Sequence, residues 1–123
     1  MRLLLLALAL SCAGAPPSRI ASKSNRYDDL VALFADWRTF QQPKRVNGVP
    51  DYSASAMAAQ HRDLAGYVNR LTAIDPIPWP IPQQVDYHVV RAEMNGLDFD
   101  HRVLRPWANN PAFYVTVFLD ESD

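Results

Sequence analysis

Proline spacing sets the strongest limit on what this chain can fold into. The segment DPIPWPIP places proline at every second position, as Pro76, Pro78, Pro80 and Pro82. Proline has no amide hydrogen and fixes φ near −65°, so this segment excludes both a helix interior and a central strand. We expect a stiff extended link between two helices, with Trp79 packed inward. A proline-rich recognition ligand is the alternative interpretation.

The residues before this link have the apolar period of two α-helices. The first helix is expected to begin near Ser24 or Asn25, which are both N-cap residue types, and to end before Pro43. The second is expected from about Ser53 to Ala73. Their apolar faces consist of Leu30, Leu33, Phe34, Trp37 and Phe40 in the first helix, and Met57, Leu64, Tyr67, Val68, Leu71 and Ile74 in the second.

The segment between these two helices, PKRVNGVPDYS, contains the turn signal Asn47-Gly48. A hairpin would need alternating strands on both sides of that turn, and the sequence shows none. We therefore expect a simple connector.

A third helix, expected to start near Pro82, is apolar over a wide arc. One stripe comprises Val85, Val89, Ala92, Gly96, Phe99 and Val103, and a second comprises Val90, Met94, Leu97 and Leu104. This arc predicts a helix that is buried on two sides, and three helices alone would leave part of it without a partner. Its polar stripe includes Asp98 and Arg102, a favourable pair four residues apart.

The third helix is expected to end at Pro106. Asn110 and Pro111 suit the N-cap and the first position of a fourth helix, and residues 112–119 carry no charge. The expected fold class is all-α, with three amphipathic helices plus the start of a fourth. Because an uncharged helix start needs a partner to bury it, we expect the chain to be the N-terminal fragment of a larger helical protein.

The first fifteen residues have the organisation of a secretory signal peptide. Arg2 supplies a positive charge, residues 3–10 are an unbroken run of Leu and Ala, and Ala13 and Ala15 occupy the small-residue cleavage positions. The apolar run is too short to span a bilayer as a helix, which needs about 20 residues. We therefore expect export.

Cys12 leaves two fates open for this segment. The sequence ALSC is a loose version of the bacterial lipoprotein signal, so lipidation of Cys12 and cleavage after Ala15 are alternatives. The expected location is periplasmic, or the outer membrane as a lipoprotein. Residues 16–25 are expected to be a flexible linker, and residues 26–123 a partial helical domain.

Charge and cysteine content exclude several classes of function. Cleavage after Ala15 would leave 11 basic and 13 acidic residues. This balance does not favour nucleic acid as a partner, and contact with a membrane is expected only through the signal or a lipid anchor. Because Cys12 is the single cysteine, no disulfide framework or thiolate metal site is expected.

No catalytic or metal-binding set is recognisable among the remaining residues. Asp98 and Asp100 point away from each other on a helix, and His88 and Glu93 lack the spacing of a zinc-binding helix. We expect His88 and His101 to be boundary residues satisfied by local hydrogen bonds. Nucleophile elbows and phosphate-binding loops are also missing from the sequence.

The segment RAEMNGLDFDHRVLRPWANNPAFY carries a resemblance to a known family. Its Pro-Trp and Asn-Pro-x-x-Tyr pattern, after a helix that ends in a basic residue, is similar to the N-terminal region of the bacterial family called domain of unknown function 885, whose members are often lipoproteins. The matching residues are Arg105, Pro106, Trp107, Asn110, Pro111 and Tyr114. The resemblance extends over about residues 26–119, and we interpret the matching residues as scaffold or cleft-wall positions.

The resemblance implies an all-helical protein several times longer than this chain, similar to zinc metallopeptidases. Its metal ligands and general base would lie in a His-Glu motif far towards the C-terminus, to which no residue here corresponds. The expected function is therefore the N-terminal fragment of an exported metallopeptidase-like hydrolase, inactive alone. Its expected partners are the missing C-terminal region and, in the full-length form, a peptide substrate.

Two alternatives remain open at this stage. In the first, the chain is a small exported helical lipoprotein or interaction module. In the second, it is the product of a truncated gene.

Overall fold

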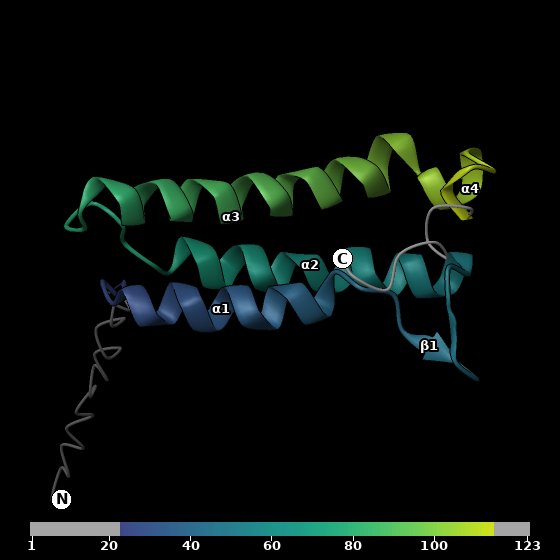
Figure 1. Cartoon of the computed structure of the whole chain (residues 1–123), viewed down its shortest axis with the longest axis horizontal. Coiled ribbons are helices and arrows are strands. Elements are labelled where there is room, and N and C mark those ends of the chain that lie inside the picture. The colour runs from purple at the N-terminus through teal and green to yellow at the C-terminus, as the bar shows by residue number, and fades with distance from the viewer. Residues whose placement is uncertain (1–22, 115–123) are drawn as a thin grey trace, which may run out of the picture.

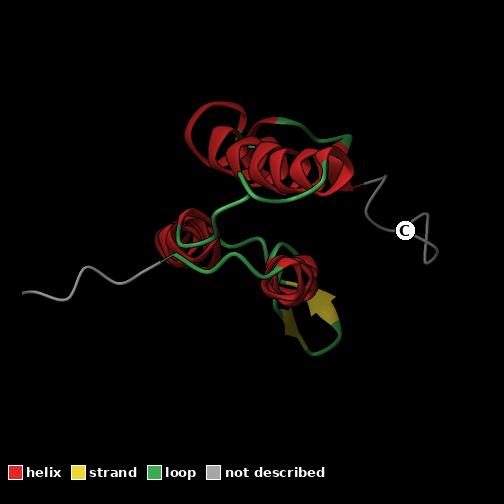
Figure 2. Cartoon of the chain, turned by 90° about the vertical axis from the view of Figure 1, so that its left-hand side faces the viewer, coloured by secondary structure: helices red, strands yellow, loops and turns green. Residues whose placement is uncertain are grey.

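The fold is built from three long helices, as seen in a computed structural model that describes residues 23–114 (Figure 1). α1 (Tyr27–Phe40), α2 (Ala54–Thr72) and α3 (Ile81–Phe99) run alternately in opposite directions along one another. Figure 2, which looks along the helices, shows their axes at the corners of a triangle. The all-α fold class predicted from the sequence is confirmed.

The chain is fixed to the end of α2 before α1 begins. The amide of Ser24 donates to the carbonyl of Ala73 at 2.9 Å, and the amide of Asp75 donates to the carbonyl of Ser24 at 2.7 Å. The Ser24 hydroxyl donates to the Asp29 carboxylate. α1 therefore starts at Tyr27, slightly later than predicted, because Ser24 bridges to the end of α2 instead of capping α1.

The connector after α1 forms a small hairpin, which the sequence analysis did not expect. β1 (Arg45–Val46) and β2 (Val49–Pro50) pair antiparallel, with Val46 opposite Val49. The two turn residues, Asn47 and Gly48, have φ of 52° and 81°. Asn-Gly is the dipeptide that favours such a turn, and it produces a hairpin although each strand is only two residues long.

α2 and the proline link agree with the sequence predictions. The Ser53 hydroxyl caps α2 by accepting from the amide of Ala56 at 3.2 Å. The link delivers Trp79 into the interior, where 7% of its surface is exposed. Its indole N–H donates to the carbonyl of Asn25 at 2.6 Å, so the link is anchored to the start of α1.

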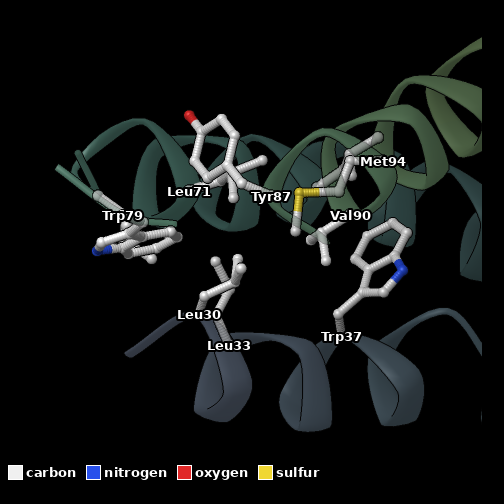
Figure 3. Close-up of a cluster of buried hydrophobic side chains, with 10 residues drawn as sticks. Leu30, Leu33, Trp37, Leu71, Trp79, Tyr87, Val90 and Met94 are labelled. Carbon is white, nitrogen blue, oxygen red and sulfur yellow. The ribbon is translucent and has the colours of Figure 1, made fainter. Parts of the chain in front are cut away.

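The core lies along the line where the three helices meet (Figure 3). α1 contributes Leu30, Leu33 and Trp37, and α3 contributes Tyr87, Val90 and Met94. The other buried members are Leu64 and Leu71 of α2, Ile74 just after α2, and Trp79 of the link. Most of these positions were predicted from helical periodicity, but Tyr87 was not. Trp37 is fully buried, and its indole N–H donates to the Glu93 carboxylate at 3.0 Å.

Among residues 23–114, α3 is covered on one side only, whereas the sequence predicts burial on two. Four side chains of the first predicted stripe are 46–51% exposed: Val85, Val89 and Phe99 of α3, and Val103 just beyond its end. The described helices pack against the other side, through Val90 and Met94. The expectation that three helices would leave part of the apolar arc without a partner is therefore confirmed within residues 23–114.

Beyond α3 the helix widens into a π-helical turn, Asp100–Leu104, and a short helix α4, Pro106–Asn109, follows. Figure 1 shows α4 and the hairpin at the same end of the bundle. The predicted signal peptide with Cys12, linker residues 16–22 and the uncharged residues 115–119 all lie outside the described residues. Among the helices of residues 23–114, none has the length and apolarity needed to cross a membrane.

Candidate functional site

At the α4 end of the bundle, a π-helical turn directs one histidine side chain into the interior. The amide of Arg105 donates to the carbonyl of Asp100 at 2.7 Å, five residues back, and closes the wide turn. The following residue can leave the helix because Arg105 takes a left-handed conformation, with φ 43°. His101 lies in this turn and is only 7% exposed, the single buried polar side chain recorded for residues 23–114.

Gln60 of α2 holds the buried histidine. Its amide nitrogen donates to the carbonyls of Phe40 at 3.1 Å and Gln41 at 3.2 Å, at the end of α1. Its amide oxygen consequently faces His101 Nε2, at 3.0 Å. Since that oxygen can only accept, His101 must carry a hydrogen on Nε2. The expectation that His101 would be satisfied by local hydrogen bonds is therefore wrong, because its partner lies on another helix.

A second histidine stacks on the first. The rings of His61 and His101 are parallel within 10°, with centroids 5.0 Å apart. His61 Nε2 lies 3.0 Å from a carboxylate oxygen of Asp98, whose other oxygen accepts from Arg102 at 2.7 Å. The predicted pair of Asp98 and Arg102 is confirmed, and it also orients His61.

Burial and charge move the pKa values of this cluster in a consistent direction. Burial of the His101 ring, followed by repulsion from His61, lowers the pKa of His101 below its usual value, although Asp100 and Asp98 oppose the change. Hydrogen bonds from His61 and then from Arg102 lower the pKa of Asp98. The cluster therefore favours a neutral His101 beside an ionised Asp98 at neutral pH.

The two histidines are not arranged to bind one zinc ion together. Imidazole lone pairs lie in the ring plane, so the lone pairs of two parallel stacked rings do not converge on one ion. Each Nε2 is already engaged, by Asp98 for His61 and by Gln60 for His101. Among residues 23–114, no group of three His, Cys, Asp or Glu side chains is arranged to hold a metal.

The residues that carry the family resemblance form one compact turn against this cluster. The Trp107 ring lies 4.8 Å from the His101 ring, and the Tyr114 hydroxyl donates to the carbonyl of Trp107 at 2.6 Å. The Asn110 side chain accepts from the amide of Ala112 at 3.0 Å, as an N-cap does, and Pro111 follows it. Arg105 contributes its left-handed backbone, while its side chain is exposed.

Two shallow hollows flank the cluster. One of about 340 Å³ lies between α2 and α3 and includes His61, Asn69, Asn95 and Asp98 in its lining. The other, of about 530 Å³, lies between the hairpin connector and the start of α2 and reaches Gln60. The His61 side chain is 39% exposed and is therefore in contact with water. Within the described residues, neither histidine is hydrogen-bonded to a hydroxyl or thiol nucleophile.

Gln60 and His61 were not predicted as site residues from the sequence. Both lie on the polar side of α2, where periodicity predicts only solvent contact. The sequence nevertheless contains a clue to this pairing, because the proline link makes the helices on its two sides fold back on each other. Residues about equally far from that link, such as His61 and Asp98, must face each other when the helices fold back antiparallel.

Comparison of the chain with protein-family models, with curated proteins and with solved structures found no match.

Proposed function

We propose that this chain is the N-terminal helical scaffold of an exported, metallopeptidase-like hydrolase of the family that its sequence resembles. In this proposal the chain contributes packing surfaces, and the zinc ion and the peptide substrate belong to other parts of the protein. The observation that carries the proposal is the outward face of α3, which is apolar and half-exposed along its length.

The free energy available at this face supports a packing role. Full burial of a Val, Leu or Phe side chain stabilises by about 1.5–3 kcal/mol, so a half-exposed one retains about 1 kcal/mol. About half of the surface is exposed at each of Val85, Val89, Phe99 and Val103. A partner that covers this stripe would therefore gain several kcal/mol, which is comparable with the net stability of a small domain.

The histidine cluster and the turn beyond it support the same role in another way. Gln60 joins the end of α1 to the π-helical turn of α3, so three helices are tied together at one end. The Tyr52 ring contacts the rings of Phe113 and Tyr114, with centroids 5.0 and 5.9 Å away. These contacts hold the turn that ends at Tyr114 against Tyr52, just before α2 begins.

The proposal is tested by the gene product that continues this reading frame. We expect a longer product to bind about one zinc ion per chain and to hydrolyse peptides in a chelator-sensitive way. We also expect the chain from residue 16 to bind a hydrophobic dye such as ANS. A stop codon after Asp123, together with a monomeric, cooperatively unfolding chain that does not bind the dye, would reject the proposal.

An interaction module anchored through Cys12 is the competing function. It predicts palmitate incorporation that disappears in Cys12→Ala, whereas cleavage after Ala15 removes Cys12 and argues against it.

A further inference from the structure

The outward face of α3 has the residue spacing of a helix–helix seam. We define the outward seam as Val85, Val89, Ala92, Gly96 and Phe99 of α3 together with Val103 of the π-helical turn that follows it, and the spacing of these residues alternates between four and three. This alternation keeps one edge of a helix in register with a partner helix over several turns. The centre of the seam carries its smallest residues, and a Cβ added at Gly96 would meet nothing within 4 Å. A second helix backbone can therefore approach closely there.

α1 widens the apolar surface beside the first half of the seam. Tyr27, Val31 and Phe34 of α1 and Val89 of α3 are among the residues that line a hollow of about 240 Å³. Val31 and Val89 are each about half exposed. This hollow is the size of a few side chains, so it can receive apolar side chains from a helix that lies along the seam.

The two flanks of the seam differ in charge. Asp86, Glu93 and Asp100 follow one flank at seven-residue intervals. The Tyr27 hydroxyl donates to Asp86 at 2.7 Å, and the Trp37 indole donates to Glu93 at 3.0 Å. Hydrogen bonds from neutral donors orient these two carboxylates without neutralising them. Within residues 23–114, no ion pair to Asp86, Glu93 or Asp100 is formed.

The other flank offers little charge. His88, Asn95 and Arg102 follow it at the same interval, and Arg102 already forms an ion pair with Asp98 at 2.7 Å. A second copy of this chain would therefore bring only weak complementary charge to the acidic flank. A helix with its own basic residues would bring more.

We infer that the outward seam binds one amphipathic α-helix, with apolar residues at alternating four- and three-residue spacing and Lys or Arg residues facing Asp86, Glu93 and Asp100. This inference rests on the proposed function, which places the occupant in another part of the same protein. Since the seam extends over 19 residues, the occupant helix is about 28 Å long. The apolar residues supply affinity, and the basic stripe selects the orientation and rejects acidic helices.

A pair of synthetic helices tests the inference on the chain from residue 16. The first is a labelled 21-residue peptide with Leu at the seam positions and Lys along one flank, and the second carries Glu in place of Lys. Fluorescence anisotropy should show at least tenfold tighter binding of the Lys peptide. The triple variant Asp86→Asn, Glu93→Gln and Asp100→Asn should reduce that preference at least fivefold, since it keeps the hydrogen-bond acceptors and removes only charge.

Two further variants separate binding at the seam from general stickiness. Val89→Asp should weaken binding of the Lys peptide at least tenfold, while Val49→Asp, at a similarly exposed valine of the hairpin, should leave it unchanged. Equal binding of both peptides, equal effects of the two variants, or a stable dimer in sedimentation that Val89→Asp dissociates would overturn the inference. A longer product without zinc or peptidase activity would reject the proposed function and leave the peptide result standing.

Discussion

The amide oxygen of Gln60 accepts a hydrogen bond from Nε2 of His101 at 3.0 Å and thereby joins two helices 41 residues apart in sequence. The same amide donates to the carbonyls of Phe40 and Gln41, which end α1. One side chain of α2 thus satisfies two carbonyls at the end of α1 and the buried His101 of the π-helical turn. This relationship ties α1, α2 and the π-helical turn together.

Replacement of Gln60 by Leu should therefore destabilise the fold. The variant keeps a similar side-chain size but leaves His101 Nε2 and two carbonyls without their partner, and each buried group left unsatisfied costs about 1–3 kcal/mol. We expect the urea midpoint to fall and the free energy of unfolding to decrease by about 2 kcal/mol or more. Gln42→Leu is the control, because Gln42 is exposed and lines the hollow beside the hairpin that Gln60 also lines, and it should change stability little. Equal effects of the two substitutions would refute the role of Gln60.

Stability should also decrease below neutral pH because of His101. Its pKa is lower in the folded chain than in the unfolded chain, so the unfolded state binds the proton first. The free energy of unfolding should therefore fall as the pH drops below about 6.5, the usual histidine pKa, and continue to fall until the folded-state pKa is passed. Urea titrations at pH 7.5 and 5.0 measure this loss. His101→Gln should show a smaller loss than the natural sequence, and an unchanged loss would contradict the assignment.

Two glycine substitutions should have opposite signs. Gly48 has φ 81° in the hairpin turn, a conformation that costs an L-residue about 1–2 kcal/mol, so Gly48→Ala should destabilise. Gly66 lies within α2, and a Cβ there meets nothing within 4 Å, so Gly66→Ala should stabilise by about 0.5–1 kcal/mol. Thermal unfolding of the two variants beside the natural chain gives the comparison. Shifts of the same sign would show that one of the two backbone assignments is wrong.

Much of the fold was predictable from local patterns in the sequence. Periodicity identified Leu30, Leu33 and Trp37 as core residues, and proline chemistry placed the link that buries Trp79. The hairpin was missed because its strands are too short to alternate, and only the conformation of Asn47 and Gly48 reveals it. Such short pairing depends on the turn, which sequence alternation does not report.

The candidate site was much less predictable than the core. Asp98 and Arg102 lie four residues apart on one helix, so their pairing follows from helix geometry alone. His61 and Gln60 acquire their partners only when α2 and α3 pack together, and the π-helical turn that directs His101 inward has no simple sequence signature. Contacts between segments distant in sequence therefore determine this part of the site, and local patterns do not predict such contacts.

The central claim is that the outward seam of α3 is covered in the assembled protein, and thiol labelling tests it most directly. Val89→Cys introduces a thiol on the seam, and Val49→Cys introduces one on the hairpin as a matched exposed control. Both should react rapidly with maleimide in the chain from residue 16, which has no other cysteine. In the longer gene product, we predict that labelling at position 89 slows at least tenfold while position 49 stays reactive. Equal, rapid labelling of both positions in the longer product would contradict the account.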